Sequence, residues 1–124
     1  RRLIERGVRM VQVSHSLDGY DIAWDTGHGD IVGGHTRLAV ACDRAIAGLI
    51  KDLKQRGLLD ETLVICLGEM GRTPQFINRG NPDGRDHWSY CFPVVLAGAG
   101  IKNGLLYGQS DRHAAYPLEY PVRS

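Results

Sequence analysis

The feature that most constrains the fold is a long amphipathic helical pattern in the first half of the chain. Apolar residues recur at spacings of three and four positions from Leu38 to Leu53, while charged residues occupy the other faces. Thr36 is the expected N-cap and Gly57 the expected C-terminal stop, and basic residues in the last turn complement the helix dipole. The pattern predicts a single helix with one apolar face.

Short apolar runs on either side of this helix predict strands. Residues 8–13 form a short run, residues 63–67 are continuously apolar, as in a strand covered on both faces, and residues 92–97 form a third run in which Pro93 places the start at an edge. A further short strand is expected around residues 105–107. Strands that alternate with a helix predict an α/β fold, part of a doubly wound, mostly parallel sheet flanked by helices.

Length and charge exclude several classes of protein. The chain has 124 residues, enough for one small domain at most. Its formal charge of +1 does not indicate a surface for nucleic acid, and no apolar run approaches the roughly 20 residues of a membrane span.

Both ends of the sequence look truncated, because residues 1–7 resemble the last turn of a helix and residues 120–124 stop where a further element would begin. We therefore expect a piece of a larger domain.

Two long loops, residues 14–34 and 68–89, follow the carboxyl ends of the first two predicted strands. They hold most of the histidines and most of the loop acids. Because ligands of open α/β sheets bind at that edge, the loops are the expected place for a functional site.

In the first loop, Asp25 and His28, with His35 just before the helix, supply oxygen and nitrogen atoms of the kind that bind Zn²⁺ or another divalent ion. Glycines on either side of His28 would let the backbone turn both side chains inward. The alternative is a solvated turn, with His35 serving only near the helix start.

The second loop contains two further groups of candidates. Glu69 follows a predicted strand directly and is either a metal ligand or the partner of Arg72, which could also clamp an oxyanion. His87 is a candidate imidazole ligand, with Asp86 as the acid that orients it. Arg85 adds positive charge that suits an anionic substrate. The alternatives are a surface ion pair, a turn before the next strand and simple solvation.

Five segments considered together resemble a known family. They are residues 7–13, Trp24-Asp25-Thr26 with His28, residues 52–64, residues 68–74 and residues 84–87. In these segments the chain resembles an uncharacterised sulfatase-like family, a domain-of-unknown-function family placed with the alkaline phosphatase and sulfatase superfamily. The resemblance covers nearly the whole chain.

The resemblance implies a metal-dependent hydrolase of phosphate or sulfate esters that acts on a small anionic ester. Asp25 and His28 correspond to the middle acid-and-histidine pair of the superfamily, Glu69 to a later acid and His87 to the final histidine. The cofactor would be a divalent metal ion: Zn²⁺, or alternatively Ca²⁺, Mg²⁺ or Mn²⁺. Residues 1–124 would be a C-terminal-half portion of one sulfatase-like α/β domain, with the early acid and the nucleophile upstream of Arg1. The resemblance also suggests export, whereas the oligomeric state is not set by the sequence.

Two departures from the family pattern favour an alternative function. Gly27 places His28 three positions after Asp25, so that His35 is the alternative ligand, and no histidine follows Glu69. The alternative is a non-catalytic or structural module whose metal site is eroded. In the leading hypothesis Asp25, His28, Glu69 and His87 meet around one shared cation.

Overall fold

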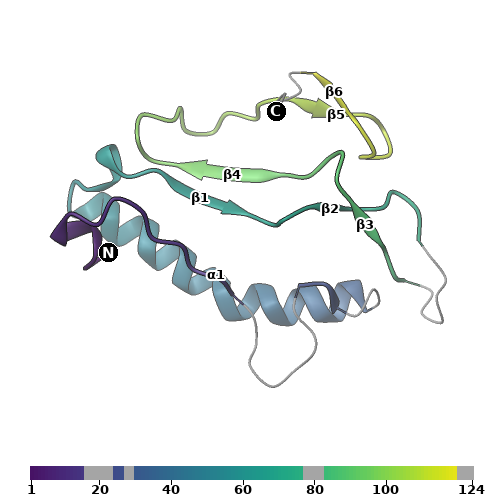
Figure 1. Cartoon of the computed structure of the whole chain (residues 1–124), viewed down its shortest axis with the longest axis horizontal. Coiled ribbons are helices and arrows are strands. Elements are labelled where there is room, and N and C mark those ends of the chain that lie inside the picture. The colour runs from purple at the N-terminus through teal and green to yellow at the C-terminus, as the bar shows by residue number, and fades with distance from the viewer. Residues whose placement is uncertain (16–23, 27–29, 77–82, 120–124) are drawn as a thin grey trace.

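The computed structural model describes residues 1–15, 24–26, 30–76 and 83–119. Within these ranges one long helix lies beneath a two-stranded ribbon, and two smaller hairpins extend from the ribbon (Figure 1). The elements in chain order are η1 (Ile4–Arg6), α1 (Ile31–Gln55), η3 (Leu59–Glu61), β1 (Val64–Leu67), β2 (Gly71–Arg72), β3 (His87–Trp88), β4 (Val94–Ala97), β5 (Gln109–Ser110) and β6 (Pro117–Glu119).

The predicted helix is confirmed as α1, but it begins earlier than the sequence pattern indicates. Thr36 is inside the helix and is not its N-cap, since its hydroxyl donates a 2.6 Å hydrogen bond to the Val32 carbonyl. The early start places Gly34 in the first turn of α1, beside Thr26. A Cβ at position 34 would overlap the Thr26 side chain, so glycine is needed there. The first turn of α1 can therefore approach the segment of residues 24–26 closely, which brings that segment to the helix.

The C-terminal end of α1 is as predicted. The helix ends at Gln55, and Gly57 follows with a φ of 70°, in the left-handed region that favours glycine. The Leu58 N–H donates a 2.9 Å hydrogen bond back to the Leu53 carbonyl. In the described part of the chain no helix is both long enough and apolar enough to cross a membrane.

The predicted doubly wound, mostly parallel sheet is wrong. The described strands form three antiparallel pairs, β1 with β4, β2 with β3 and β5 with β6. In the main ribbon Val64 lies opposite Ala97 and Leu67 opposite Val94. Parallel neighbours need a crossover, usually a helix, but the long helix precedes β1 and a hairpin connects β1 to β4. The antiparallel arrangement follows from that order.

Burial also differs from the prediction. The buried apolar side chains among the described residues are Leu38, Leu53 and Ala115, two of them on α1. Residues 63–67 do contain a strand, but β1 is not covered on both faces, because Ile65 is 51% exposed and Leu67 58% exposed. The continuous apolar run was typical of a strand inside a covered sheet, but three of the four residues of β1 are exposed.

The weaker strand predictions had mixed outcomes. Residues 92–97 contain β4, which starts one residue after Pro93. Residues 8–13 and 105–107 are extended or irregular and pair with no strand among the described residues; β5 begins two residues after the second of these segments. The stretch of residues 68–89, predicted to be a loop, contains β2 and β3.

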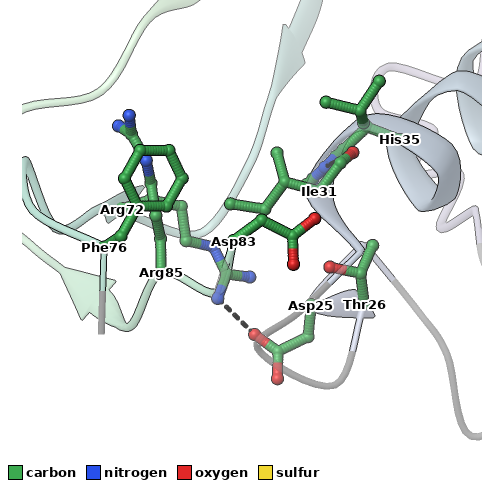
Figure 2. Close-up of a pocket in the computed structure, with 9 residues that line it drawn as sticks. Asp25, Thr26, Ile31, His35, Arg72, Phe76, Asp83 and Arg85 are labelled. Atoms are coloured by element: carbon green, nitrogen blue, oxygen red, sulfur yellow. Dashed lines mark hydrogen bonds and ion pairs between the residues drawn. The ribbon is translucent and has the colours of Figure 1, made fainter. Parts of the chain in front are cut away.

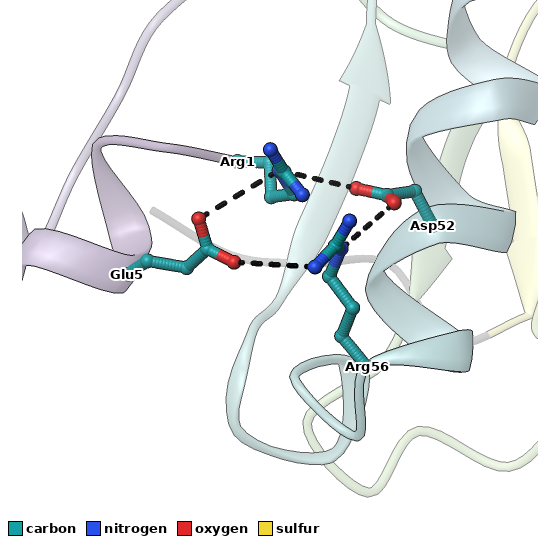
Figure 3. A network of polar contacts seen from close by, with 4 residues as sticks. All are labelled: Arg1, Glu5, Asp52 and Arg56. Carbon is teal, nitrogen blue, oxygen red and sulfur yellow. Dashed lines mark hydrogen bonds and ion pairs between the residues drawn. The ribbon is translucent and has the colours of Figure 1, made fainter.

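A ring of four charged side chains holds the N-terminal segment against the end of α1 (Figure 3). Arg56 donates a 2.8 Å hydrogen bond to Asp52, and Arg1 Nε lies 3.4 Å from the other Asp52 oxygen. Glu5 of η1 closes the ring, 3.7 Å from Arg1 and 3.8 Å from Arg56. The hydrogen bond from Arg56 lowers the pKa of Asp52 below its ordinary value, and the positive charges of Arg56 and Arg1 act in the same direction.

This ring predicts a specific loss of stability in acid. A carboxyl whose pKa is lower in the folded state stabilises the fold above its ordinary pKa of 3.8, and that contribution disappears as the pH falls through the lowered value. We expect wild type to be more stable than Asp52→Asn at pH 6 and the difference to vanish near pH 2, as measured by thermal unfolding across this range. In an Arg56→Gln background the pH dependence should be smaller. A difference that stays constant down to pH 2 would contradict this role of the ring.

Candidate functional site

The hairpin of β2 and β3 places two candidate residues side by side. In its antiparallel register Arg72 lies directly opposite His87, and Gly71 lies opposite Trp88. Directly opposed residues of a hairpin project from the same face, so the guanidinium and the imidazole reach the same region. Glycine is required at position 71 because a Cβ there would overlap the backbone carbonyl oxygen of Cys91.

Hydrogen bonds beyond the strand ends fix this hairpin. Thr73 N–H donates to the Asp86 carbonyl at 2.9 Å, and Asp86 N–H donates to the Thr73 hydroxyl at 3.1 Å. The Asp86 carboxylate accepts a 3.0 Å hydrogen bond from the backbone N–H of His87. The His87 ring is hydrogen-bonded to Asp25, and the role predicted for Asp86 in orienting that ring stays a prediction.

The opposite face of β3 is held by an aromatic cluster. The Trp88 indole donates a 2.7 Å hydrogen bond to the buried Ala115 carbonyl, and its ring centroid lies 5.0 Å from that of Tyr90 and 5.6 Å from that of Tyr116. Asp111 closes the turn below, since its carboxylate accepts the N–H groups of Ala115 and His113. These backbone hydrogen bonds lower the pKa of Asp111. His87 therefore projects from a strand that is anchored on its other side.

Asp25 connects this hairpin to the first loop. Its Oδ1 atom accepts a 2.9 Å hydrogen bond from His87 Nε2 and also pairs with Arg72 Nη1, a buried nitrogen. The side chains of Asp25, Arg72 and His87 are 34%, 21% and 47% exposed, so the cluster is sheltered but open to solvent. Because a carboxylate only accepts, the proton of a neutral His87 ring is on Nε2, which makes Nδ1 its acceptor.

A pocket of about 310 Å³ opens beside this cluster (Figure 2). Arg72, Phe76 and Arg85 lie on one side of it, and the first turns of α1 lie on the other. The Arg85 guanidinium carbon lies 4.7 Å from the centre of the Phe76 ring, within the range of a cation–π interaction. The residues lining the pocket are Asp25, Thr26, Ile31, Val32, His35, Arg72, Phe76, Asp83 and Arg85.

His35 reaches this pocket from α1, and not from the loop before the helix as predicted. Its Nδ1 donates a 2.8 Å hydrogen bond to the Ile31 carbonyl oxygen. The ring also lies 5.8 Å, centre to centre, from Trp24, whose indole donates a 3.1 Å hydrogen bond to His15. His35 therefore has Nε2 as its remaining acceptor when the ring is neutral.

The structure brings together part of the predicted set. Asp25, Arg72 and His87 are in contact, and His35 and Arg85 line the adjacent pocket. Glu69 is exposed and is not among the residues that line this pocket. His28 lies outside the described residues, so the predicted convergence of Asp25, His28, Glu69 and His87 is seen for Asp25 and His87.

The described donors do not by themselves make a metal site. Asp25 and His87 offer one carboxylate and one imidazole, whereas a catalytic zinc site has three protein ligands. Among the described residues no group of three or more His, Cys, Asp or Glu side chains is arranged to hold a metal ion. The Asp25 oxygen that faces His87 is also paired with the Arg72 guanidinium, an unfavourable neighbour for a cation.

Phe76 and Asp83 are among the pocket residues that sequence reasoning missed. Phe76 lies two positions after Pro74 in a stretch without periodicity, and nothing in the sequence links it to Arg85 nine positions later. Asp83 precedes Gly84 and reads as an ordinary turn residue. Its position became apparent only from the hydrogen bond that its carboxylate accepts from the Asp30 backbone N–H, at 3.3 Å.

Comparison with known proteins gives a family and no activity. The family model described as "Protein of unknown function (DUF1501)" matches residues 1–124. No curated protein and no solved structure matches the chain. Because the match covers all 124 residues, the chain belongs to the DUF1501 family.

Proposed function

We propose that this chain forms part of a hydrolase that binds a phosphate or sulfate ester. The observation that carries the proposal is the contact of one Asp25 oxygen with both His87 and Arg72, beside a pocket that Arg85 also lines. An oriented acid–histidine pair next to guanidinium groups is an arrangement suited to hydrolysis of an anionic ester. The resemblance to sulfatase-like proteins supports the same reaction class.

Arginine suits the binding step. A guanidinium group presents several N–H donors in one plane and stays charged at all ordinary pH values, so it can hold two oxygens of a phosphate or sulfate group at once. Arg85 lies over the Phe76 ring, which restricts its orientation. Arg72 is already paired with Asp25, and we therefore assign the larger share of anion binding to Arg85.

His87 suits proton transfer. Asp25 bonds Nε2 and thereby fixes the ring, as in the acid–histidine pairs that pass a proton between water and a leaving group. A positioned acid or base of this kind accelerates a reaction by about 10²- to 10⁴-fold. Asp25 would also stabilise the imidazolium ion that forms when Nδ1 is protonated.

Whether hydrolysis requires a divalent metal ion is a separate question, which the proposal leaves to measurement. Asp25 and His87 carry atoms that metals accept, and the roles above are assigned to the side chains alone. Hydrolysis that chelation abolishes and Zn²⁺, Mn²⁺, Mg²⁺ or Ca²⁺ restores would establish the dependence.

The second candidate is a structural role without catalysis. The ion pair between Asp25 and the buried Nη1 of Arg72 ties residues 24–26 to β2, and this would be useful to the fold even without a substrate. An exposed ion pair contributes little stability, whereas loss of one partner of a buried group is costly. The two candidates differ in whether Arg85, which is not part of that ion pair, affects ester binding.

The proposal is tested with the intact protein, 4-nitrophenyl sulfate and 4-nitrophenyl phosphate. We expect hydrolysis of at least one ester and a rise in KM of about tenfold or more for Arg85→Ala. The rise should be smaller for Arg85→Lys, which keeps the positive charge but lacks the planar guanidinium group that can bind two oxygens at once. Arg44→Ala removes an exposed arginine of α1 and should leave KM unchanged. If wild type hydrolyses neither ester, with or without added metal, the structural role is the correct one.

A further inference from the structure

The charged side chains that line the pocket are balanced in number, although an anion is its proposed ligand. Among the described lining residues two are arginines, Arg72 and Arg85, and two are aspartates, Asp25 and Asp83. Asp25 is accounted for by its contacts with Arg72 and His87. Asp83 has no part in the function proposed above, and a carboxylate opposes the binding of any anion.

The structure holds Asp83 at this position. Its Oδ1 accepts the backbone N–H of Asp30, directly before the first residue of α1, at 3.3 Å. Figure 2 shows Asp83 between the two arginines and the first turn of α1. A segment far along the sequence is thereby joined to the start of the helix, and its negative charge is placed within the pocket lining.

The size of the pocket makes that charge effective. A sphere of 310 Å³ is about 8 Å across, no more than the Debye length of about 8 Å at physiological ionic strength, so a bound anion would interact with every charge of the lining. Asp25 largely compensates Arg72, since the two are paired. The attraction of Arg85 and the repulsion of Asp83 then act on the ligand together. For a dianion both interactions double and still oppose each other, so the nearly neutral lining offers it little net attraction, whereas the cost of removing its charge from water rises with the square of that charge.

We propose that Asp83 sets the charge of the ligand, so that the pocket prefers esters with one negative charge to esters with two. This inference rests on the proposed function and narrows its substrate class. A phosphate monoester carries a charge of about −1.5 to −2 near neutral pH. Sulfate monoesters and phosphate diesters carry a single charge, and these two share the chemistry that the pocket favours.

The test uses three ligands that share a phenyl group and resist hydrolysis. Benzenesulfonate carries one charge, phenylphosphonate carries two at pH 8.5, and the monomethyl ester of phenylphosphonate carries one while keeping phosphorus. The third ligand separates charge from the identity of the central atom. Calorimetric titration of the intact protein at pH 8.5 gives a Kd for each. A pocket suited to sulfate monoesters should favour benzenesulfonate among the two monoanions, and one suited to phosphate diesters should favour the monomethyl ester.

Asp83→Asn is the decisive variant, since asparagine keeps an oxygen that accepts the Asp30 N–H but removes the charge. Wild type should bind both monoanions more tightly than phenylphosphonate. In the variant we expect affinity for phenylphosphonate to rise about tenfold and affinity for each monoanion about threefold, as Coulomb interaction at high dielectric predicts for two charges against one. Asp43→Asn removes a charge on α1 about 18 Å along the helix from Ile31 and should change neither.

Several results would overturn the inference. One such result is that Asp83→Asn changes the affinities for the monoanions and the dianion equally, or changes none of them. Another is that wild type binds phenylphosphonate more tightly than the two monoanions. If the variant unfolds, the salt dependence of wild type decides, because 0.5 M NaCl should reduce the preference for monoanions and a preference that persists unchanged would contradict the role of Asp83. Failure of wild type to bind any of the three ligands, with Arg85→Ala no different, would instead overturn the proposed function itself.

Discussion

Asp25→Ala should lower kcat/KM for ester hydrolysis by about 10²- to 10⁴-fold, the largest loss that we expect from a single side chain of the site. The substitution removes the acceptor that fixes the His87 ring and leaves Arg72 Nη1 buried without its carboxylate. The loss should appear mainly in kcat, because proton transfer belongs to the transition state. Steady-state kinetics with 4-nitrophenyl esters measures it directly.

Stability must be separated from catalysis in this experiment. An unpaired buried donor costs about 1–3 kcal/mol, so Asp25→Ala should also unfold at a lower urea concentration. Asp25→Asn retains an oxygen for His87 and should lose less stability, yet it lacks the charge that stabilises an imidazolium ion and should still lose most of the activity. If Asp25→Asn keeps wild-type kcat, Asp25 serves the fold and not the reaction.

Gly71→Ala should destabilise the protein by about 2–4 kcal/mol, because the added Cβ would overlap the backbone carbonyl of Cys91 and cannot move away without displacing β2. Arg72 and His87 are the residues that this hairpin positions, so ester binding should be lost together with stability. Urea unfolding and ligand titration measure the two effects.

Gly68→Ala is the matched control, three residues earlier in the same segment. A Cβ at position 68 would meet its nearest atom, the Met70 carbonyl oxygen, at 3.6 Å, which is ordinary contact. We expect its stability to lie within about 1 kcal/mol of wild type. Equal effects of the two substitutions would mean that the close approach at Gly71 does not hold the hairpin.

The helix was predictable from the sequence, while the sheet was not. The apolar period of α1 and the stop at Gly57 are local features, and both were correct. Strand direction depends on how strands are connected, and the apolar runs at β1 and β4 were interpreted as parts of a parallel sheet even though the segment between them shows no helical period. That absence was the signal for an antiparallel pair.

The site was predictable in part for a similar reason. Asp25, Arg72 and His87 were recognisable because acids, arginines and histidines in glycine-rich loops are the usual carriers of chemistry. Their meeting at one Asp25 oxygen depends on the register of β2 and β3, which no local pattern specifies. Phe76 and Asp83 owe their roles to neighbours that are distant in sequence, Asp83 to the N–H of Asp30 among them.

The most direct test of the account is a double-mutant cycle on kcat/KM with Asp25→Ala and His87→Ala. If Asp25 acts through the His87 ring, the double variant should be little worse than His87→Ala alone. The coupling between the two residues should then equal nearly the whole effect of Asp25→Ala, about 2.7–5.4 kcal/mol for its 10²- to 10⁴-fold loss. Losses that simply multiply would show that Asp25 and His87 act independently and would contradict the central claim.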